Sequence, residues 1–231
     1  LGEVAGRRVA FLPRHGRDHR LLPGQVPYRA NVWAMAALGV QRLFGPCAAG
    51  SLQAEIGPGH FVFCDQFVDW TRGRQTSFAL GPVAAHLPAA DPYCPVLRRQ
   101  LARQAEEMAL PHHDEGTVVV IEGPRFSTRA ESRFFAAQGW QVVNMTQVPE
   151  VTLARELGIC YANVSLITDY DAGLEGDPDV QPVTHEAVLR IFDENVDRLK
   201  ELIRRTIAAL PERDKEQCAC AQGPTLMRGG A

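Results

Sequence analysis

The sequence predicts one α/β domain with a central mixed, largely parallel β-sheet that is flanked by helices. Three observations predict it. Short apolar, β-branched runs alternate along the chain with segments of helical period, which is the pattern of strands joined by crossover helices. The run Thr117–Ile121 (TVVVI) is apolar throughout, as expected of a strand covered on both faces. No repeat, linker or change of composition divides the 231 residues, so we expect a single domain.

The first half of the chain contains three predicted strands and two predicted helices. The strands are residues 9–12, 43–47 and 61–67, and a long polar loop over residues 13–24 follows the first. A helix over residues 28–38 ends before Gly39, because glycine readily adopts the left-handed conformation that follows a helix. A second helix, over residues 92–110, carries Arg and Glu on the face expected to meet water.

The second half continues the alternation after the strand at residues 117–121. A helix is predicted over residues 129–138, and strands over residues 141–143 and 161–167. A helix over residues 149–157 starts with proline, which is tolerated in a first turn, and stops before a glycine. Thr184 is expected to cap a long amphipathic helix over residues 185–210. The residues from Pro211 onward are expected to form a frayed tail.

Composition and charge exclude several classes of protein. The net charge of -3 argues against a general nucleic-acid binder, which carries a basic excess. No apolar run approaches membrane-spanning length, and no basic segment followed by an apolar one indicates a secretory signal. We therefore expect a cytoplasmic protein that binds neither nucleic acid nor a membrane.

The six cysteines fall into two groups. Four of them stand in apolar surroundings, where a reduced buried thiol is usual: Cys47, Cys64, Cys94 and Cys160. Cys218 and Cys220 stand in the polar C-terminal tail. Two cysteines are too few ligands for a structural zinc site, so no metal is expected. The pair is interpreted as incidental, with a redox-labile local disulfide as the alternative.

Polar, charged or glycine-rich segments follow five of the predicted strands. In chain order they read PRHGRDH, GPCAAGSL, EGPRFSTRAES, NMTQVPE and TDYD. Ligands of open α/β sheets bind outside the carboxyl ends of the strands, so we expect these segments to line one shared pocket.

The first two of these segments favour an anion. Arg14 and His15 suit an oxyanion better than a metal, because a guanidinium offers a planar fork of donors; a surface ion pair is the alternative for Arg14. His15 and His19 have the spacing of metal ligands on a helix, but Gly16 and the flanking prolines make a helix improbable there. The small residues of CAAGSL would let backbone N–H groups approach an anion, or would only allow tight packing.

The pair Asp169 and Asp171 is the most specific indication of a ligand in the sequence. In an extended stretch, residues two positions apart share one face, and two close carboxylates push one pKa upward. An adenine ring needs such a pair, one group for N7 and one to accept from the 6-amino group. The alternative is a loop with two solvated aspartates.

Together these motifs resemble the 5'-methylthioadenosine phosphorylases of the trimeric purine nucleoside phosphorylase family. The resemblance runs from about Val9 to Leu210 and is carried by RHGRDHRLLP, VPYRANVWAM, GSLQAEIGPGHFVFCDQFVDWT, EGPRFSTRAES, NMTQVPEV, ARELGICYA and TDYD. It implies a nucleoside phosphorylase domain over residues 1–210, a C-terminal tail over residues 211–231, and a homotrimer. It also implies phosphate as co-substrate, with no metal or organic cofactor.

The resemblance assigns roles to individual residues. Phosphate binding falls to Arg14, His15, Cys47, the backbone at Ala48, and Thr146. Asn144 and Met145 are expected to bind the ribose, and Phe126 is expected to pack on the purine. Asp169 is expected to contact N7, and Asp171 the 6-amino group. The residues expected near the 5' end are His19, His185 and Val188. Asp169 is the expected catalytic residue. His86 is expected to reach the pocket of a neighbouring subunit.

Three departures from the family pattern qualify these roles. The family opens with a strand and a Gly-rich phosphate loop, and this sequence starts after that point, which is expected to expose a sheet edge. Cys47 stands where a phosphate-binding Thr is usual, and a thiol is a weak donor. His185 stands where methylthio-preferring enzymes have an apolar residue, as in 6-oxopurine phosphorylases, whose histidine meets a 5'-hydroxyl.

The expected reaction is phosphorolysis of 5'-methylthioadenosine to adenine and 5-methylthioribose 1-phosphate. The alternatives are a phosphorylase for adenosine, inosine or methylthioinosine, a hydrolytic nucleosidase, and a non-catalytic nucleoside-binding fragment.

Overall fold

A computed structural model describes residues 1–79, 85–173, 180–213, 218–221 and 225–226. Its centre is a seven-stranded sheet with the strand order β5-β8-β9-β3-β10-β4-β7. The strands of this sheet are β3 (Arg42–Ser51), β4 (Phe61–Val62), β5 (Gln66–Trp70), β7 (His112–His113), β8 (Thr117–Ile121), β9 (Val142–Asn144) and β10 (Cys160–Asp169). Four neighbouring pairs are parallel (β5–β8, β8–β9, β3–β10 and β4–β7), and two are antiparallel (β9–β3 and β10–β4). The predicted mixed, largely parallel sheet is therefore confirmed.

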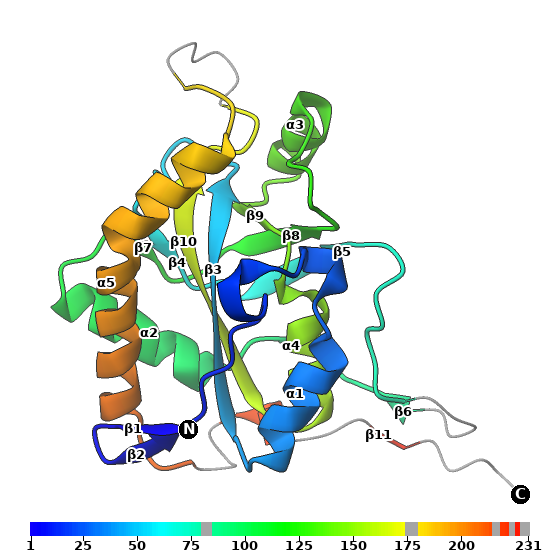
Figure 1. Cartoon of the computed structure of the whole chain (residues 1–231), viewed down its shortest axis with the longest axis vertical. Coiled ribbons are helices and arrows are strands. Elements are labelled where there is room, and N and C mark those ends of the chain that lie inside the picture. The colour runs from blue at the N-terminus through cyan, green and yellow to red at the C-terminus, as the bar shows by residue number, and fades with distance from the viewer. Residues whose placement is uncertain (80–84, 174–179, 214–217, 222–224, 227–231) are drawn as a thin grey trace, which may run out of the picture.

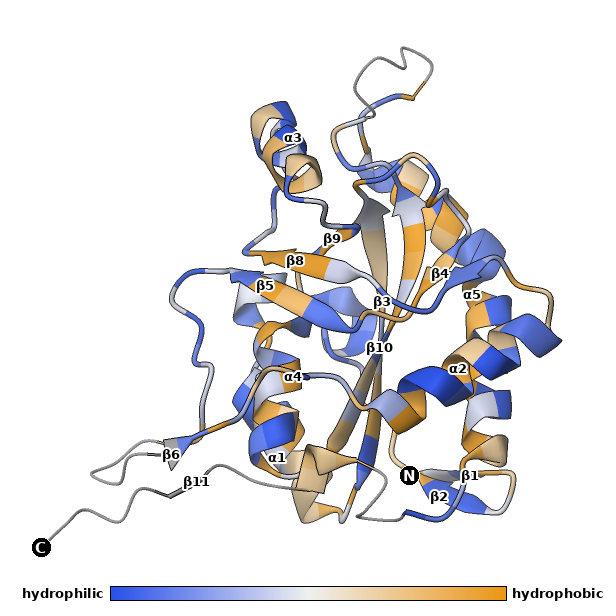
Figure 2. Cartoon of the chain, turned by 180° about the vertical axis from the view of Figure 1, so that it is seen from behind, coloured by the Kyte–Doolittle hydropathy of each residue, from blue (hydrophilic) through white to orange (hydrophobic). Residues whose placement is uncertain are grey.

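Helices cover both faces of this sheet (Figure 1). They are α1 (Tyr28–Ala37), α2 (Pro95–Glu107), α3 (Arg129–Ala137), α4 (Gln147–Glu156) and α5 (His185–Ala209). Helices α2 and α5 pack together on one side of β10, and α1 and α4 pack on the other. Figure 2 shows α2 and α5 with hydrophobic and hydrophilic residues mixed along their length, as expected of helices that lay one face on a sheet.

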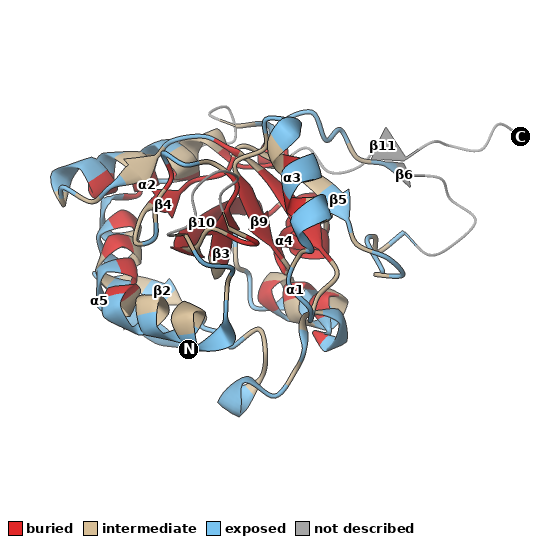
Figure 3. Cartoon of the chain, turned by 90° about the horizontal axis from the view of Figure 1, so that it is seen from above, coloured by how far each residue is buried: buried red, intermediate tan, exposed pale blue. Residues whose placement is uncertain are grey.

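Strand β10 separates two apolar cores. Its even-numbered residues, from Cys160 to Leu166, face α2 and α5 and pack with residues such as Leu101 and Leu202. Its odd-numbered residues Tyr161 and Ile167 belong to the core on the other side. This period of two is the expected alternation of a strand. The buried residues gather in the central strands (Figure 3), and β10 is buried on both faces, including its polar residues Asn163 and Ser165.

Three sequence predictions are corrected at the strands. The strand predicted at residues 9–12 does not form; the chain before it makes a hairpin outside the central sheet, with strands β1 (Gly2–Val4) and β2 (Arg7–Val9), and residues 10–12 have no regular structure. The strand predicted at residues 61–67 is two strands, β4 and β5, on opposite sides of the sheet. The glycine-rich segment after residue 47 is not a loop, because β3 continues through it to Ser51.

The remaining elements lie outside the main sheet. They are the short 3-10 helices η1 (Arg17–His19), η2 (Pro23–Gln25) and η3 (Ala219–Ala221), and the strands β6 (Ala85–His86) and β11 (Thr225–Leu226), which pair with each other. Most of the predicted tail from Pro211 lies outside the described residues. Within the described part, none of the helices is long and apolar enough to cross a membrane.

Candidate active site

The site lies where two neighbouring strands of the sheet, β9 and β3, run in opposite directions. β9 runs antiparallel to β3, and its last residues pair with β3 at Gly50 and Ser51. The carboxyl end of β9 therefore points along β3 toward Cys47 instead of ending at the same edge as β10. The predicted polar segments do converge, but they do so across this β9–β3 junction and not at one edge of the sheet.

Gly50 allows the two predicted aspartates to sit against the sheet. A Cβ atom at this position would lie 2.9 Å from Asp169 Oδ1 and 3.3 Å from Asp171 Cβ. Contacts of this length leave no room for a side chain. The glycine of CAAGSL is therefore required for close packing at the end of β10.

Asp169 is the last residue of β10 and is held by two hydrogen bonds. The hydroxyl of Thr168 donates to its Oδ2 at 2.7 Å, and the backbone N–H of Asp171 donates to its Oδ1 at 2.8 Å. Burial raises the pKa of Asp169 to about 6, and these two hydrogen bonds oppose the rise. A carboxyl group with this pKa is protonated in about one molecule in ten at pH 7, far more than an ordinary aspartate, so it can act as a proton donor.

Asp171 is almost completely buried, with 2% of its surface exposed. Its backbone has φ 50°, which is uncommon but tolerated by aspartate. Burial raises the pKa of this carboxyl group, and the neighbouring hydroxyl of Ser132 opposes the rise. Its Oδ2 atom has no hydrogen-bond partner among the described residues. A buried acceptor without a donor is costly, so Asp171 is ready to accept a hydrogen bond from a ligand.

Arg14 is fixed by a buried carboxylate that the sequence analysis missed. Its Nε and NH2 groups donate to the two oxygens of Glu150 at 2.7 and 2.8 Å, and Tyr161 donates to the same carboxylate at 2.6 Å. Burial acts to lower the pKa of Arg14, but Glu150 more than offsets it and the pKa is raised. Gly45 makes the arrangement possible, because a Cβ there would lie 2.0 Å from the Tyr161 hydroxyl.

Arg14 is directed toward the middle of β3 by a further bond. Its NH1 group donates to the carbonyl oxygen of Pro46 at 3.0 Å, which places the guanidinium beside Cys47. Since a guanidinium has five N–H donors and these three bonds use three of them, two remain for an anion. The surface ion pair considered as an alternative for Arg14 is wrong, since only 15% of its side chain is exposed.

Cys47 connects β3 to the residues after β9. Its sulfur accepts hydrogen bonds from Asn144 Nδ2 and Asn163 Nδ2, each at 3.4 Å. The Asn144 Oδ1 atom in turn accepts from the backbone N–H of Thr146 at 3.4 Å. These contacts bring Arg14, Cys47, Asn144 and Thr146 into one continuous group. Ala48 follows Cys47 in β3, where it pairs with Leu166 of β10.

His15 and His19 stack on each other beside this group. Their ring centroids are 4.2 Å apart, and His15 Nδ1 lies 2.8 Å from the carbonyl oxygen of Leu21. Because a carbonyl only accepts, Nδ1 carries the hydrogen and Nε2 is left for a ligand. Burial lowers the pKa of His15, so a neutral imidazole is favoured until an anion binds.

The β8–α3 loop and the β9–α4 turn lie against each other. A Cβ at Gly123 would lie 2.6 Å from Met145 Sδ, so the glycine lets Met145 approach. Arg74, also missed from the sequence, donates to the carbonyl oxygens of Met145 and Val148 at 2.8 and 2.6 Å. Phe126, in the same loop as Gly123, is 37% exposed and thus has surface left for a ring to stack on.

The start of α5 is tied to the end of β10. The backbone N–H of Val183 donates to the carbonyl oxygen of Asp171 at 2.8 Å, and the Thr184 hydroxyl accepts from Ala187 as the predicted cap. His185 is exposed and Val188 half-buried in the first turn of this helix. Both therefore belong to the segment beside the two aspartates.

His86 does not join the site of its own chain. It lies on β6, which pairs only with β11 among the described residues and projects from the body of the protein (Figure 1). The preceding residues 80–84 lie outside the described part of the chain.

Comparison with known proteins places the chain in a family. The sequence profile of the phosphorylase superfamily matches residues 1–208. The chain belongs to the phosphorylase superfamily. It is 50% identical over 221 residues to the S-methyl-5'-thioadenosine phosphorylase of Pyrococcus abyssi, covering 96% of this chain and 83% of that protein. It is also 50% identical over 228 residues to the purine nucleoside phosphorylase of Streptomyces coelicolor, covering 95% and 80%.

Solved structures of this superfamily have the same fold. An adenosine/methylthioadenosine phosphorylase mutant from Schistosoma mansoni, in complex with adenine, superposes with a TM-score of 0.84 at 36% identity, covering 91% of this chain and 83% of that one. Another mutant of the same enzyme, in complex with methylthioadenosine, gives a TM-score of 0.83 at 36% identity, covering 91% and 80%. The resemblance read from the sequence motifs is confirmed.

Proposed function

We propose that the protein catalyses the reversible phosphorolysis of 5'-methylthioadenosine to adenine and 5-methylthioribose 1-phosphate. One observation carries the proposal. Asp169, the half-buried last residue of β10, and the buried Asp171 lie against Gly50 of β3, the strand whose Pro46 carbonyl oxygen accepts a hydrogen bond from Arg14. This arrangement occurs in a chain that is half identical to proteins named as methylthioadenosine phosphorylases.

Phosphate is held by residues on the β3 side of the site. Arg14 supplies positive charge and two donors, and Thr146 supplies a hydroxyl at the start of α4. His15 offers Nε2, while Cys47 and the backbone at Ala48 lie on the β3 wall. A thiol is a weak donor, so Cys47 contributes mainly through its neighbours.

The nucleoside occupies the space between these residues and the two aspartates. Asp171 accepts from the 6-amino group through its unpartnered Oδ2, which distinguishes adenine from a 6-oxopurine. Phe126 stacks on the purine, and Asn144 and Met145 contact the ribose. His19 and Val188 line the 5' end, where the methylthio group lies.

The chemical step exchanges one bond for another. The glycosidic C1'–N9 bond breaks while a phosphate oxygen bonds to C1', and the electron pair of the broken bond stays on the purine. Asp169 stabilises the leaving purine by donating a hydrogen bond or proton to N7. Stabilisation of developing charge by preorganised groups of this kind usually contributes more to catalysis than any other effect. The reaction requires phosphate as co-substrate and no cofactor.

The assembly and location of the protein are part of the proposal. In a homotrimer, His86 on the projecting β6 arm would complete the pocket of a neighbouring subunit. A cytoplasmic location agrees with the reduced cysteines, all six of which are free.

A second substrate is favoured by His185. An imidazole in the first turn of α5, beside the segment bonded to Asp171, can accept or donate to a 5'-hydroxyl. Adenosine is therefore proposed as a weaker substrate than methylthioadenosine.

The test is the phosphate dependence of adenine release from methylthioadenosine by the purified protein. The rate should rise with phosphate from a negligible value and saturate. A rate that is unchanged in phosphate-free buffer would indicate a hydrolase, and no adenine release at any phosphate concentration would indicate a binding protein.

A further inference from the structure

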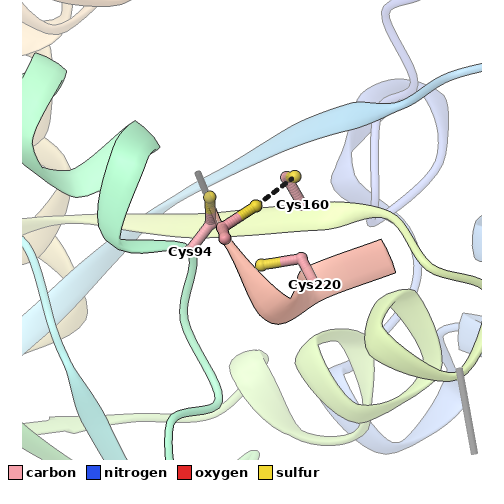
Figure 4. A group of neighbouring side chains, drawn as sticks. Cys94, Cys160 and Cys220 are labelled. Atoms are coloured by element: carbon pink, nitrogen blue, oxygen red, sulfur yellow. Dashed lines mark hydrogen bonds between the residues drawn. The ribbon is translucent and has the colours of Figure 1, made fainter. Parts of the chain in front are cut away.

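Four cysteines meet at the end of β10 opposite the active site. Cys160 is the first residue of β10, Cys94 is the residue before α2, and Cys218 and Cys220 come from the segment around η3. Their sulfur atoms all lie within 4.8 Å of one another. Figure 4 shows the side chains of Cys94, Cys160 and Cys220 close together. The two cysteines interpreted as incidental from the sequence thus gain two partners through the fold.

We propose that these four cysteines bind one zinc ion as a structural tetrathiolate site. Zinc binds thiolates at about 2.3 Å in a tetrahedron, which separates neighbouring sulfur atoms by about 3.8 Å. Cys160 Sγ and Cys218 Sγ are 3.7 Å apart. A disulfide needs a separation of about 2.0 Å, and all four thiols are free. Small shifts of the side chains are enough to close the cluster around an ion.

Two positively charged arginine side chains lie near the cluster. A zinc ion with four thiolates carries a net charge of about -2, and each thiol that binds releases its proton to water. Arg155 is 5% exposed, its Nε has no hydrogen-bond partner among the described residues, and its charge acts on Cys220. Arg42 acts in the same way on Cys160 and Cys94. The anionic site would offset these positive charges.

The site is closed, as structural zinc sites are. Cys94, Cys160 and Cys220 are at most 2% exposed, so no position is left open for a substrate. The ten residues of β10 span about 30 Å and separate the cluster from Asp169. Its role is to hold the C-terminal segment against α2 and β10, where Arg213 also donates to the carbonyl oxygen of Gly158 at 2.7 Å.

The spacing of Cys218 and Cys220 explains why the sequence did not indicate this site. Zinc ligands usually come in pairs separated by two to four residues, whereas one residue separates this pair. The turn of η3 brings both sulfur atoms to the same side. Cys94 and Cys160 are 66 residues apart and are brought together by the fold, in which the N–H of Cys94 donates to the carbonyl oxygen of Tyr161 at 2.8 Å.

The test is the metal content of the protein produced with added zinc and purified anaerobically with a reductant that does not bind metals. Elemental analysis should find one zinc per chain. Replacement by Co²⁺ should produce the strong visible absorption of a tetrahedral thiolate site. No bound zinc in the reduced protein, with disulfides between Cys94 and Cys160 and between Cys218 and Cys220 after air exposure, would overturn the proposal.

Variants separate this site from other thiols. Cys218→Ser should lose zinc and lower the melting temperature, with kcat/KM for methylthioadenosine unchanged at a temperature where the variant is folded. Cys64→Ala removes a buried thiol outside the cluster and should keep its zinc. Zinc retained by Cys218→Ser, or lost equally by Cys64→Ala, would contradict the assignment. The metal content of the unaltered protein decides the proposal even where a variant fails to fold.

Discussion

Raising the pH should remove the proton that Asp169 gives to the purine. Burial raises the pKa of this carboxyl group to about 6. As the pH rises through this value, the protonated fraction falls, and with it the capacity to donate to N7. Two pH units above the pKa, about 1% of the groups remain protonated, so kcat/KM should fall about 100-fold between pH 5 and pH 8.

The assay must separate Asp169 from phosphate, which also changes charge in this range. Asp169→Asn provides the control, because its amide N–H can donate to N7 at every pH but does not titrate. The ratio of kcat/KM for the native protein to that for Asp169→Asn therefore cancels the ionisation of phosphate. Since kcat/KM reports the free enzyme, this ratio should decline with an apparent pKa of about 6.

One result would refute this reasoning. If the two profiles run parallel from pH 5 to pH 8, the proton on Asp169 is not used in the reaction. Asp169 would then act only by holding the Asp171 backbone through its 2.8 Å hydrogen bond.

Three other substitutions test separate parts of the site. Asp171→Asn should shift the ratio of methylthioadenosine to methylthioinosine activity toward the oxopurine by roughly 5- to 150-fold. This factor corresponds to about 1–3 kcal/mol for a mismatched buried polar group. An unchanged ratio would show that Asp171 does not recognise the base. His185→Val should lower kcat/KM for adenosine by a similar factor and leave methylthioadenosine unaffected at saturating phosphate, whereas equal effects on both would place His185 on the helix surface. Gly45→Ala places a Cβ 2.0 Å from the Tyr161 hydroxyl, so it should destabilise the protein by about 1–3 kcal/mol and lower the melting temperature by several degrees; an unchanged melting temperature would show that the Tyr161–Glu150 contact is dispensable.

The features that could be predicted from the sequence are those that depend only on residues close together along the chain. The cap of α5, the glycines that follow α1 and α4, and the buried run of β8 depend on neighbouring residues and are found in the structure. The aspartate pair could also be predicted from the sequence, because Asp169 and Asp171 are only two positions apart and therefore stay close in any fold. Their raised pKa values follow from burial in the fold.

The features that could not be predicted depend on contacts between distant segments. Nothing in the neighbourhood of Arg14 indicates that Glu150, 136 residues away, binds it. The segment after residue 47 is rich in small residues that favour turns, yet the ladder with β10 keeps it extended. The sequence between Phe61 and Phe67 is apolar enough for one strand, but the chain crosses the sheet within it. The cysteine cluster likewise exists only once α2, β10 and η3 are packed.

The sugar product tests the central claim most directly. The purified protein should be incubated with methylthioadenosine and phosphate, and the products followed by ³¹P nuclear magnetic resonance while adenine is measured. The phosphorolytic site built around Arg14 and Asp169 predicts one equivalent of a sugar 1-phosphate for each adenine released. Free 5-methylthioribose, with the phosphate signal unchanged, would contradict it.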